Sequence, residues 1–187
     1  MEKSDGEIIK DYLNGDNDAL KMLIGRYLKH IYNFVFQYVM SRPDAEDIAQ
    51  ETFIKAWKNL EKFDTKKSFK IWLFIIAKNT AVDFLRRKKT IPFSEFENEK
   101  EENTLLAVLA DENPIPDEVL RRADIGKEVN EAVKKINPIY RTVLYLHYYD
   151  GFNLREVAEI MGESADTVKS RHRRALILLK EMLEKVE

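Results

Sequence analysis

Residues 153–183 read NLREVAEIMGESADTVKSRHRRALILLKEML, and this stretch decides the fold of the C-terminal part of the chain. Apolar residues recur every three or four positions on both sides of Gly162, which indicates two helices. Ala158 is small where the helices must cross, Gly162 gives the backbone freedom for a turn, and Val168 packs into the angle. The spacing therefore predicts a helix-turn-helix, with Ser164 capping the second helix.

The second helix of this motif separates its residues by face. An apolar stripe would hold the helix to its domain: Val168, His172, Ala175, Leu176, Leu179 and Met182. Polar and cationic residues lie mostly off that stripe: Thr167, Lys169, Ser170, Arg171, Arg173 and Arg174. Such side chains hydrogen-bond base edges and phosphates in the major groove, so the pattern favours duplex DNA binding. An amphipathic hairpin with a solvated basic face would have the same pattern, and His172 is expected to pack against the core.

The remainder of the chain also has helical spacing. Most of the few Gly and Pro residues, 6 and 5 of 187 in total, stand between helical segments, and the sequence has neither an alternating strand pattern nor a fixed repeat. The first half predicts four helices, the second ending at Arg42-Pro43 and the third capped by Asp44. Further helices are expected over 117–135 and from Pro138 onward. The fold class is all-α, with two small helical domains.

Charge is distributed unevenly along the chain. The net charge is only −2, but residues 66–89 hold eight Lys or Arg and one Asp. Residues 90–120 hold nine acids and one Lys, and the part from 91 to 116 is interpreted as an acidic flexible linker. The helix near 68–89 is either a nucleic-acid surface or a core helix with a solvated basic end.

Composition argues against several classes of protein. Cysteine is absent and there are only three histidines, so neither a zinc site nor a catalytic triad is indicated. A Gly-rich phosphate loop is also missing, and no metal or other cofactor is expected. The longest apolar run has seven residues, whereas a membrane span needs roughly 20. We expect a cytoplasmic protein that is not an enzyme and does not insert into a membrane.

Two segments resemble one known family. Residues 44–89, DAEDIAQETFIKAWKNLEKFDTKKSFKIWLFIIAKNTAVDFLRRKK, are similar to region 2 of bacterial RNA polymerase sigma factors of the sigma-70 family. Residues 136–183, with their TVKSR and RRAL elements, are similar to region 4. The order of the two segments, with an acidic linker in place of region 3, resembles the extracytoplasmic-function (ECF) type. The resemblance implies a region 2 domain over 1–90, the linker over 91–116 and a region 4 domain over 117–187.

The resemblance also implies partners and contact residues. Region 2 would dock on the β′ coiled coil of core RNA polymerase through Asp47, Gln50, Glu51, Phe53 and Ile54. It would bind the single-stranded −10 element, including a flipped base, through Phe63, Lys66, Lys67, Asn79, Arg86, Arg87 and Lys88. Region 4 would read the duplex −35 element through the six residues from Thr167 to Arg174 named above, and would touch the β flap. Many family members are held by an anti-sigma factor, which is a further candidate partner.

Two other functions fit parts of the pattern. A stand-alone transcription regulator would use only the C-terminal helix-turn-helix and would bind duplex DNA without polymerase. A helical adaptor would use its amphipathic faces to bind proteins. A sigma factor is expected to bind promoter DNA weakly by itself and strongly as part of the polymerase, and to direct promoter-specific initiation from the −10 and −35 elements.

Overall fold

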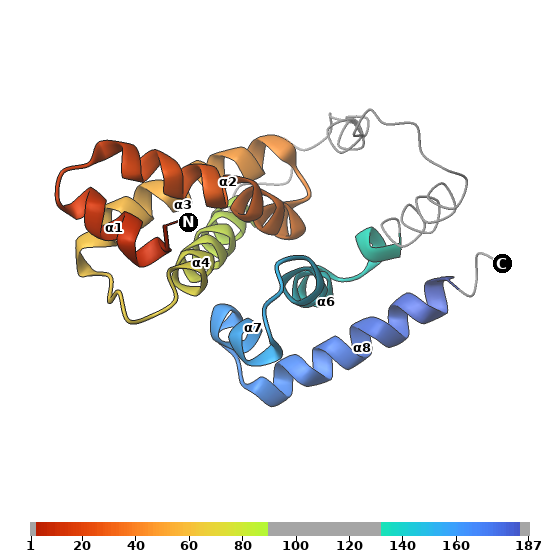
Figure 1. The fold of residues 1–187 in the computed structure, drawn as a ribbon. Helices are drawn as coiled ribbons and strands as arrows, with labels where there is room; N and C mark the ends of the chain where they lie inside the picture. The colour runs from red at the N-terminus through yellow and green to blue at the C-terminus, as the bar shows by residue number, and fades with distance from the viewer. Residues whose placement is uncertain (1–2, 90–131, 184–187) are drawn as a thin grey trace, which may run out of the picture.

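The structure is a computed structural model that describes residues 3–89 and 132–183, and those residues form helices joined by short loops (Figure 1). The N-terminal half contains α1 (Asp5–Leu13), α2 (Asn17–Val39), α3 (Arg42–Asn59), the 3₁₀ turn η1 (Leu60–Lys62) and α4 (Phe69–Lys89). The C-terminal half contains α6 (Pro138–Leu144), the π-helical turn η3 (Tyr145–Tyr149), α7 (Leu154–Met161) and α8 (Ala165–Leu183). The all-α prediction is confirmed, while the expected 91–116 linker and most of the 117–135 helix lie outside the described residues.

Local sequence determines where most helices begin. The Ser4 hydroxyl accepts a hydrogen bond from the Glu7 N–H, and the Glu7 carboxylate accepts one from the Ser4 N–H, which completes a capping box. Asp16 caps α2 as predicted, because its carboxylate accepts from the N–H of Asp18. Asn137 caps α6 in the same way, directly before Pro138.

The start of α3 differs from the sequence prediction. The helix begins at Arg42, with Ser41 as the N-cap residue and Pro43 inside the first turn. The prediction that Asp44 caps this helix is therefore wrong, because proline is compatible with the first turn and does not have to precede the cap. Asp44 lies instead in the first turn, where a carboxylate is favoured by the helix dipole.

Buried side chains from both halves form one continuous hydrophobic core. The N-terminal half contributes Leu23, Ile31, Phe34, Ile48, Leu73 and Phe74, among others. The C-terminal half contributes Val143, Leu146, Phe152, Val157, Ala158, Met161 and Val168 to the same core. Figure 1 shows α4 between the other N-terminal helices and the α6–α7 side of the molecule. The two halves, which the sequence predicts as separate domains, are packed together in this structure.

A second, smaller cluster fixes the long C-terminal helix. Ile136, Leu144 and Ala175 are buried together, and Tyr140, Leu178, Leu179 and Met182 pack around them. This cluster holds α8 against α6 along the outside of the molecule (Figure 1). The opposite face of α8 is consequently left open to a partner.

Candidate nucleic-acid interface

The helix-turn-helix is fixed by local hydrogen bonds at both ends of its turn. Asn153 and Glu156 form a capping box at the start of α7. Gly162 ends α7 in the left-handed region, with φ of 70°, where a side chain would be strained. Ser164 accepts from the Thr167 N–H at 3.1 Å and so caps α8, as the sequence predicts. Ala158 and Val168, the predicted crossing residues, are both buried.

The predicted −35 contact residues lie along one side of α8. Five of the six are exposed: Thr167, Lys169, Ser170, Arg173 and Arg174. Arg171 is half-buried and forms an ion pair with Glu163, at the turn that precedes α8. Val168 and Ala175 are fully buried behind them and hold the helix to its domain. The arrangement leaves a polar, cationic face free to enter a DNA groove.

A polar hollow of about 580 Å³ adjoins this face. Its lining combines predicted residues of α8 with residues of α6 and its cap: Asn137, Ile139, Tyr140, Asp166, Thr167, Ser170, Arg171 and Arg174. The lining includes two guanidinium groups, an amide and three hydroxyl groups, which are groups that bind phosphate oxygens, together with the carboxylate of Asp166. Asn137 and Tyr140 are not among the residues that the sequence predicts for this surface. An Asn before a Pro is already explained by its role as a helix cap, so the sequence gives no further signal for Asn137.

His172 is held by neighbouring rings. Its ring stacks on Tyr148 with centroids 5.6 Å apart, and its Nε2 lies 3.1 Å from the Tyr148 hydroxyl oxygen. His147 approaches edge-on at 5.1 Å. Burial lowers the pKa of His172, and the nearby His147 lowers it further. A neutral, stacked ring suits the packing role expected for His172, although Tyr148 itself is 63% exposed.

The loop before α4 is a fixed turn on an aromatic surface. Asp64 accepts hydrogen bonds from the backbone N–H groups of Lys66 and Lys67, which leaves both lysine side chains exposed. The half-buried Phe63 ring lies 4.9 Å from Trp72 and 5.6 Å from Phe69, centroid to centroid. An aromatic surface beside two cations is a combination used to bind single-stranded nucleic acid.

Asn79 lies farther along the same helix. It is exposed, and its amide oxygen accepts from the ammonium of Lys78 at 3.3 Å. Seven residues separate it from Trp72, which is about 10 Å along a helix that rises 1.5 Å per residue. The loop and Asn79 therefore lie at two ends of one strip of α4, too far apart for Phe63 and Asn79 to contact the same flipped base from opposite sides.

The basic end of α4 is tied to α3 by ion pairs. Lys88 contacts the carboxylate of Asp44 at 2.7 Å, and Arg87 lies 3.6 Å from Glu51. Glu51 also contacts Lys55 at 2.8 Å, and that hydrogen bond is the main reason that the pKa of Glu51 is lowered. Arg86 and Arg87 are exposed, whereas Lys88 is half-buried. Arg87, which is predicted to bind DNA, is thus paired with Glu51, which is predicted to bind polymerase.

The outer face of α3 carries most of the predicted polymerase contacts. Asp47 and Gln50 are exposed, and Ile54 is 52% exposed although it is aliphatic. Phe53 is different, because only 6% of it is exposed and its ring packs 5.8 Å from Trp57. The family resemblance placed it among the docking residues, but its side chain belongs to the hydrophobic core.

The described ranges, 3–89 and 132–183, contain neither a candidate metal site nor a candidate membrane-spanning helix. No three His, Cys, Asp or Glu side chains there are grouped so that they could hold a metal ion. None of the helices described is both long enough and apolar enough to cross a membrane.

Comparison with known proteins identifies both halves. The family model described as Sigma-70 region 2 matches residues 23–91, and the model described as Sigma-70, region 4 matches residues 127–179. The ECF RNA polymerase sigma factor SigW of Bacillus subtilis is 31% identical over 176 residues, covering 94% of each chain. The ECF RNA polymerase sigma-E factor of Haemophilus influenzae is 29% identical over 182 residues, covering 97% of this chain and 94% of that protein.

Solved structures have the same fold. CnrH, in complex with the cytosolic domain of CnrY, matches with a TM-score of 0.68 and 22% identity, over 99% of this chain and 100% of that one. The sigma factor RpoE of Bartonella quintana, in complex with the anti-sigma factor NepR, matches with a TM-score of 0.68 and 23% identity, over 88% of this chain and 96% of that one.

Proposed function

The chain belongs to the sigma-70 family, as an ECF-type sigma factor that directs promoter-specific transcription initiation, and we propose how its surfaces divide that work. Members of this family bind core RNA polymerase and promoter DNA and are not enzymes. The proposal assigns polymerase docking and −10 recognition to a domain over residues 1–90, and −35 recognition to a domain over 117–187. Residues 91–116 serve as the linker between them.

The −35 element is read by α8. The exposed side chains of Lys169, Ser170, Arg173 and Arg174 enter the major groove, and α7 crosses the DNA backbone. The hollow beside Asn137 and α8 takes a phosphate group, since its guanidinium and amide donors match phosphate oxygens. The buried Val168 and Ala175 keep the helix rigid while its other face makes these contacts.

The −10 element is bound as a single strand by the strip of α4 that begins at the Phe63 loop. Lys66 and Lys67 neutralise phosphates, and the Phe63 ring offers a surface on which a flipped base stacks. The amide of Asn79 hydrogen-bonds a base farther along the strand. Arg86, Arg87 and Lys88 hold the phosphate backbone beyond it.

Polymerase docks on the outer face of α3. Asp47 and Gln50 supply polar contacts to the β′ coiled coil, and the exposed Ile54 supplies an apolar one. Glu51 contributes at the edge of this face. The region 4 half contacts the β flap. The protein therefore acts in the cytoplasm, where the polymerase is.

An anti-sigma factor is a further proposed partner. Both of the structural matches described above are complexes, one with the cytosolic domain of CnrY and one with the anti-sigma factor NepR. A protein of that kind would inhibit this chain by covering the docking and DNA-binding surfaces.

The observation that carries this proposal is the presence of two cationic surfaces of different kinds in one chain. A stand-alone regulator needs the α8 face but has no use for an aromatic, basic strip on α4. Run-off transcription with purified core polymerase and genomic promoter fragments tests the proposal. Transcripts that begin at defined promoters only when the chain is added are expected. Tight, specific duplex binding without polymerase, and no transcripts with it, would favour the regulator.

A further inference from the structure

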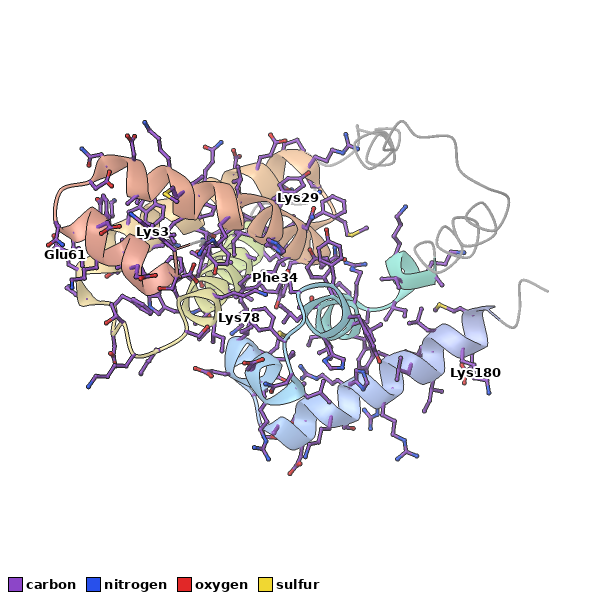
Figure 2. All side chains as sticks on the ribbon, in the orientation of Figure 1. Lys3, Lys29, Phe34, Glu61, Lys78 and Lys180 are labelled. Carbon is purple, nitrogen blue, oxygen red and sulfur yellow. The ribbon has the colours of Figure 1, made fainter. Side chains whose placement is uncertain are left out.

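The DNA-facing part of α8 is held to its domain by a narrow line of buried residues. Val168 and Ala175 are both 0% exposed, and because they are seven positions apart they lie on nearly the same side of the helix. Both side chains are small, and the burial of apolar surface has no preferred direction. Figure 2 shows side chains of α8 projecting toward α6 and also away from it. The rotation of this part of α8 about its own axis, its roll, therefore needs further contacts to be fixed.

Arg171 and His172 flank this buried line on its two sides. A helix turns by about 100° per residue, so Arg171 lies about 50° to one side of the line and His172 about 50° to the other. Both side chains are half-buried, whereas the residues directly before and after them in the sequence are exposed. The two residues are therefore placed to oppose rotation of α8 in the two directions.

The Arg171 flank is tied to the turn that precedes α8. Nη1 of Arg171 lies 2.5 Å from Oε2 of Glu163, and the two side chains are only 22% and 25% exposed. Glu163 directly follows Gly162, whose left-handed backbone conformation sets the direction of the turn. The attraction between two charges is stronger where water is partly excluded. This ion pair therefore holds one flank of α8 to the end of α7.

The His172 flank is tied to the π-helical turn η3. Nε2 of His172 lies 3.1 Å from the Tyr148 hydroxyl oxygen, and the two rings stack with centroids 5.6 Å apart. His147 is itself fixed, because its Nδ1–H donates to the carbonyl of Phe152 at 2.8 Å. The His147 ring packs edge-on against both other rings, with centroids 4.7 Å from Tyr148 and 5.1 Å from His172. The second flank of α8 is thus held by a group of rings on a different segment from the first.

Small changes in roll are large on the scale of a base pair. Side chains end about 6 Å from the axis of a helix, so a roll of about 30° moves their ends by roughly 3 Å. Successive base pairs are about 3.4 Å apart. A roll of this size would move the exposed cations of α8 from one base pair toward the next. The roll of α8 consequently decides which bases its exposed face can reach.

We propose that Arg171 and His172 are positioning residues that fix the roll of α8 for −35 recognition. Glu163 and Tyr148 act through them and do not touch DNA. Arg171, which the family resemblance places among the −35 contacts, holds the helix and leaves contact with DNA to its exposed neighbours. The assignment rests on the proposed role of α8 in reading the −35 element.

Selection from a promoter library randomised at the −35 element tests both ties, with the full chain assembled on purified core polymerase. Glu163→Gln and Tyr148→Ala each remove one tie and leave every proposed DNA contact in place. Each variant is expected to change base preferences several-fold at more than one position of the element. The dependence of promoter affinity on salt should stay as in wild type, because no phosphate contact is lost. Loss of a direct contact would instead change a single position or lower the salt slope by about one.

Matched controls separate positioning from general effects. Glu159→Gln removes an exposed carboxylate of α7. Tyr149→Ala removes the exposed ring next to Tyr148, which stacks on Tyr145 instead of α8, with centroids 4.7 Å apart. Both controls should keep the wild-type base preferences. Cooperative thermal unfolding and normal binding to core polymerase establish that each variant is folded.

Exchange of the two charges is the decisive measurement for Arg171. Arg171→Glu alone should alter −35 preferences, and adding Glu163→Arg should restore most of the wild-type pattern, because the ion pair forms again with its charges exchanged. A direct DNA contact could not be restored in this way, since the double variant carries an acid at position 171. A folded double variant without recovery would overturn the assignment of Arg171. Unchanged preferences in Glu163→Gln or in Tyr148→Ala would overturn the tie that the variant removes. A wild-type complex with no preference among −35 sequences would overturn the proposed function of α8 itself.

Discussion

His30 of α2 donates a hydrogen bond from Nδ1 to the Oδ1 atom of Asp150, 2.6 Å away and 120 residues later in the chain. The Asp150 side chain is 0% exposed, whereas the His30 ring is 41% exposed. The second carboxylate oxygen of Asp150 is buried with no hydrogen-bond partner among the described residues. A buried carboxylate with one oxygen unpaired is costly, so this contact depends on the packing around it.

The first prediction concerns the pH dependence of stability. Burial raises the pKa of Asp150, and the hydrogen bond from His30 only partly opposes that rise. A carboxyl group whose pKa is higher in the packed state than in the unfolded state takes up its proton more readily when packed, so lowering the pH favours packing.

We therefore expect wild type to gain free energy of unfolding, relative to Asp150→Asn, as the pH falls from about 7 to about 4, near the ordinary pKa of an unfolded Asp. Urea unfolding followed by circular dichroism at several pH values measures this difference. Carboxyl groups whose pKa is lowered, such as those of Glu7 and Glu51, are present in both proteins and their contributions cancel. Parallel pH profiles for the two proteins would contradict the prediction.

The sequence predicted the features that depend on neighbours along the chain. Asp16 capping α2, the turn at Gly162 and the Ser164 cap of α8 all follow from local hydrogen bonds or backbone freedom, and all three are confirmed. The start of α3 was misplaced because Pro43 is compatible with two local structures, an end of one helix or a first turn of the next. Only packing against the rest of the molecule selects between them.

Features that depend on distant residues were not predictable in the same way. Phe53 is not such a case, because the apolar spacing of α3 places it with the buried Ile48, Thr52 and Ala56, and only the family resemblance named it as a docking residue. Arg141 and Asp150 are charged residues whose burial depends on partners more than 100 positions away. The burial of Phe74 likewise depends on distant residues, because its ring packs against both Phe34 and Phe152.

The second prediction concerns −35 recognition. Arg174 is exposed and borders the hollow beside α8, so Arg174→Ala should cost about 1–3 kcal/mol in promoter binding by the polymerase complex. Arg171→Ala should cost a similar amount but should also destabilise the fold, because it removes the partner of Glu163. Filter binding and thermal unfolding separate the two effects.

A promoter with an altered −35 element distinguishes the type of contact that Arg174 makes. The altered element should mask the loss if Arg174 contacts a base, and it should leave the loss unchanged if Arg174 contacts a phosphate. Lys62→Ala serves as the control for a general change in charge. Wild-type promoter use by both arginine variants would show that the recognition face has been assigned to the wrong side of α8.

The third prediction concerns −10 recognition. Asn79 is exposed, so Asn79→Ala should preserve the fold while reducing transcription from promoters with a matched −10 element several-fold. Binding to core polymerase should be unchanged. Asn59→Ala is a matched control, because Asn59 is an exposed amide at the end of α3, where it donates to the Lys55 carbonyl of its own helix. An equal loss of promoter use and core binding in Asn79→Ala would indicate misfolding instead of a lost base contact.

The fourth prediction separates docking residues from residues that position the basic end of α4. Asp47→Lys should weaken assembly with core polymerase on a gel-filtration column, because Asp47 is exposed on the outer face of α3. Glu51→Gln should have a smaller effect on docking, since Glu51 lies at the edge of that face, and an additional effect on α4, since Glu51 pairs with both Lys55 and Arg87. Exposed ion pairs contribute only about 0–1 kcal/mol, so Glu51→Gln should change stability little. Its main effect should be to free Arg87, which raises the salt dependence of promoter binding by about one phosphate contact.

Glu159→Lys, an equal charge reversal on α7, is the control for Asp47→Lys, and normal assembly of Asp47→Lys would show that polymerase docks elsewhere on the chain.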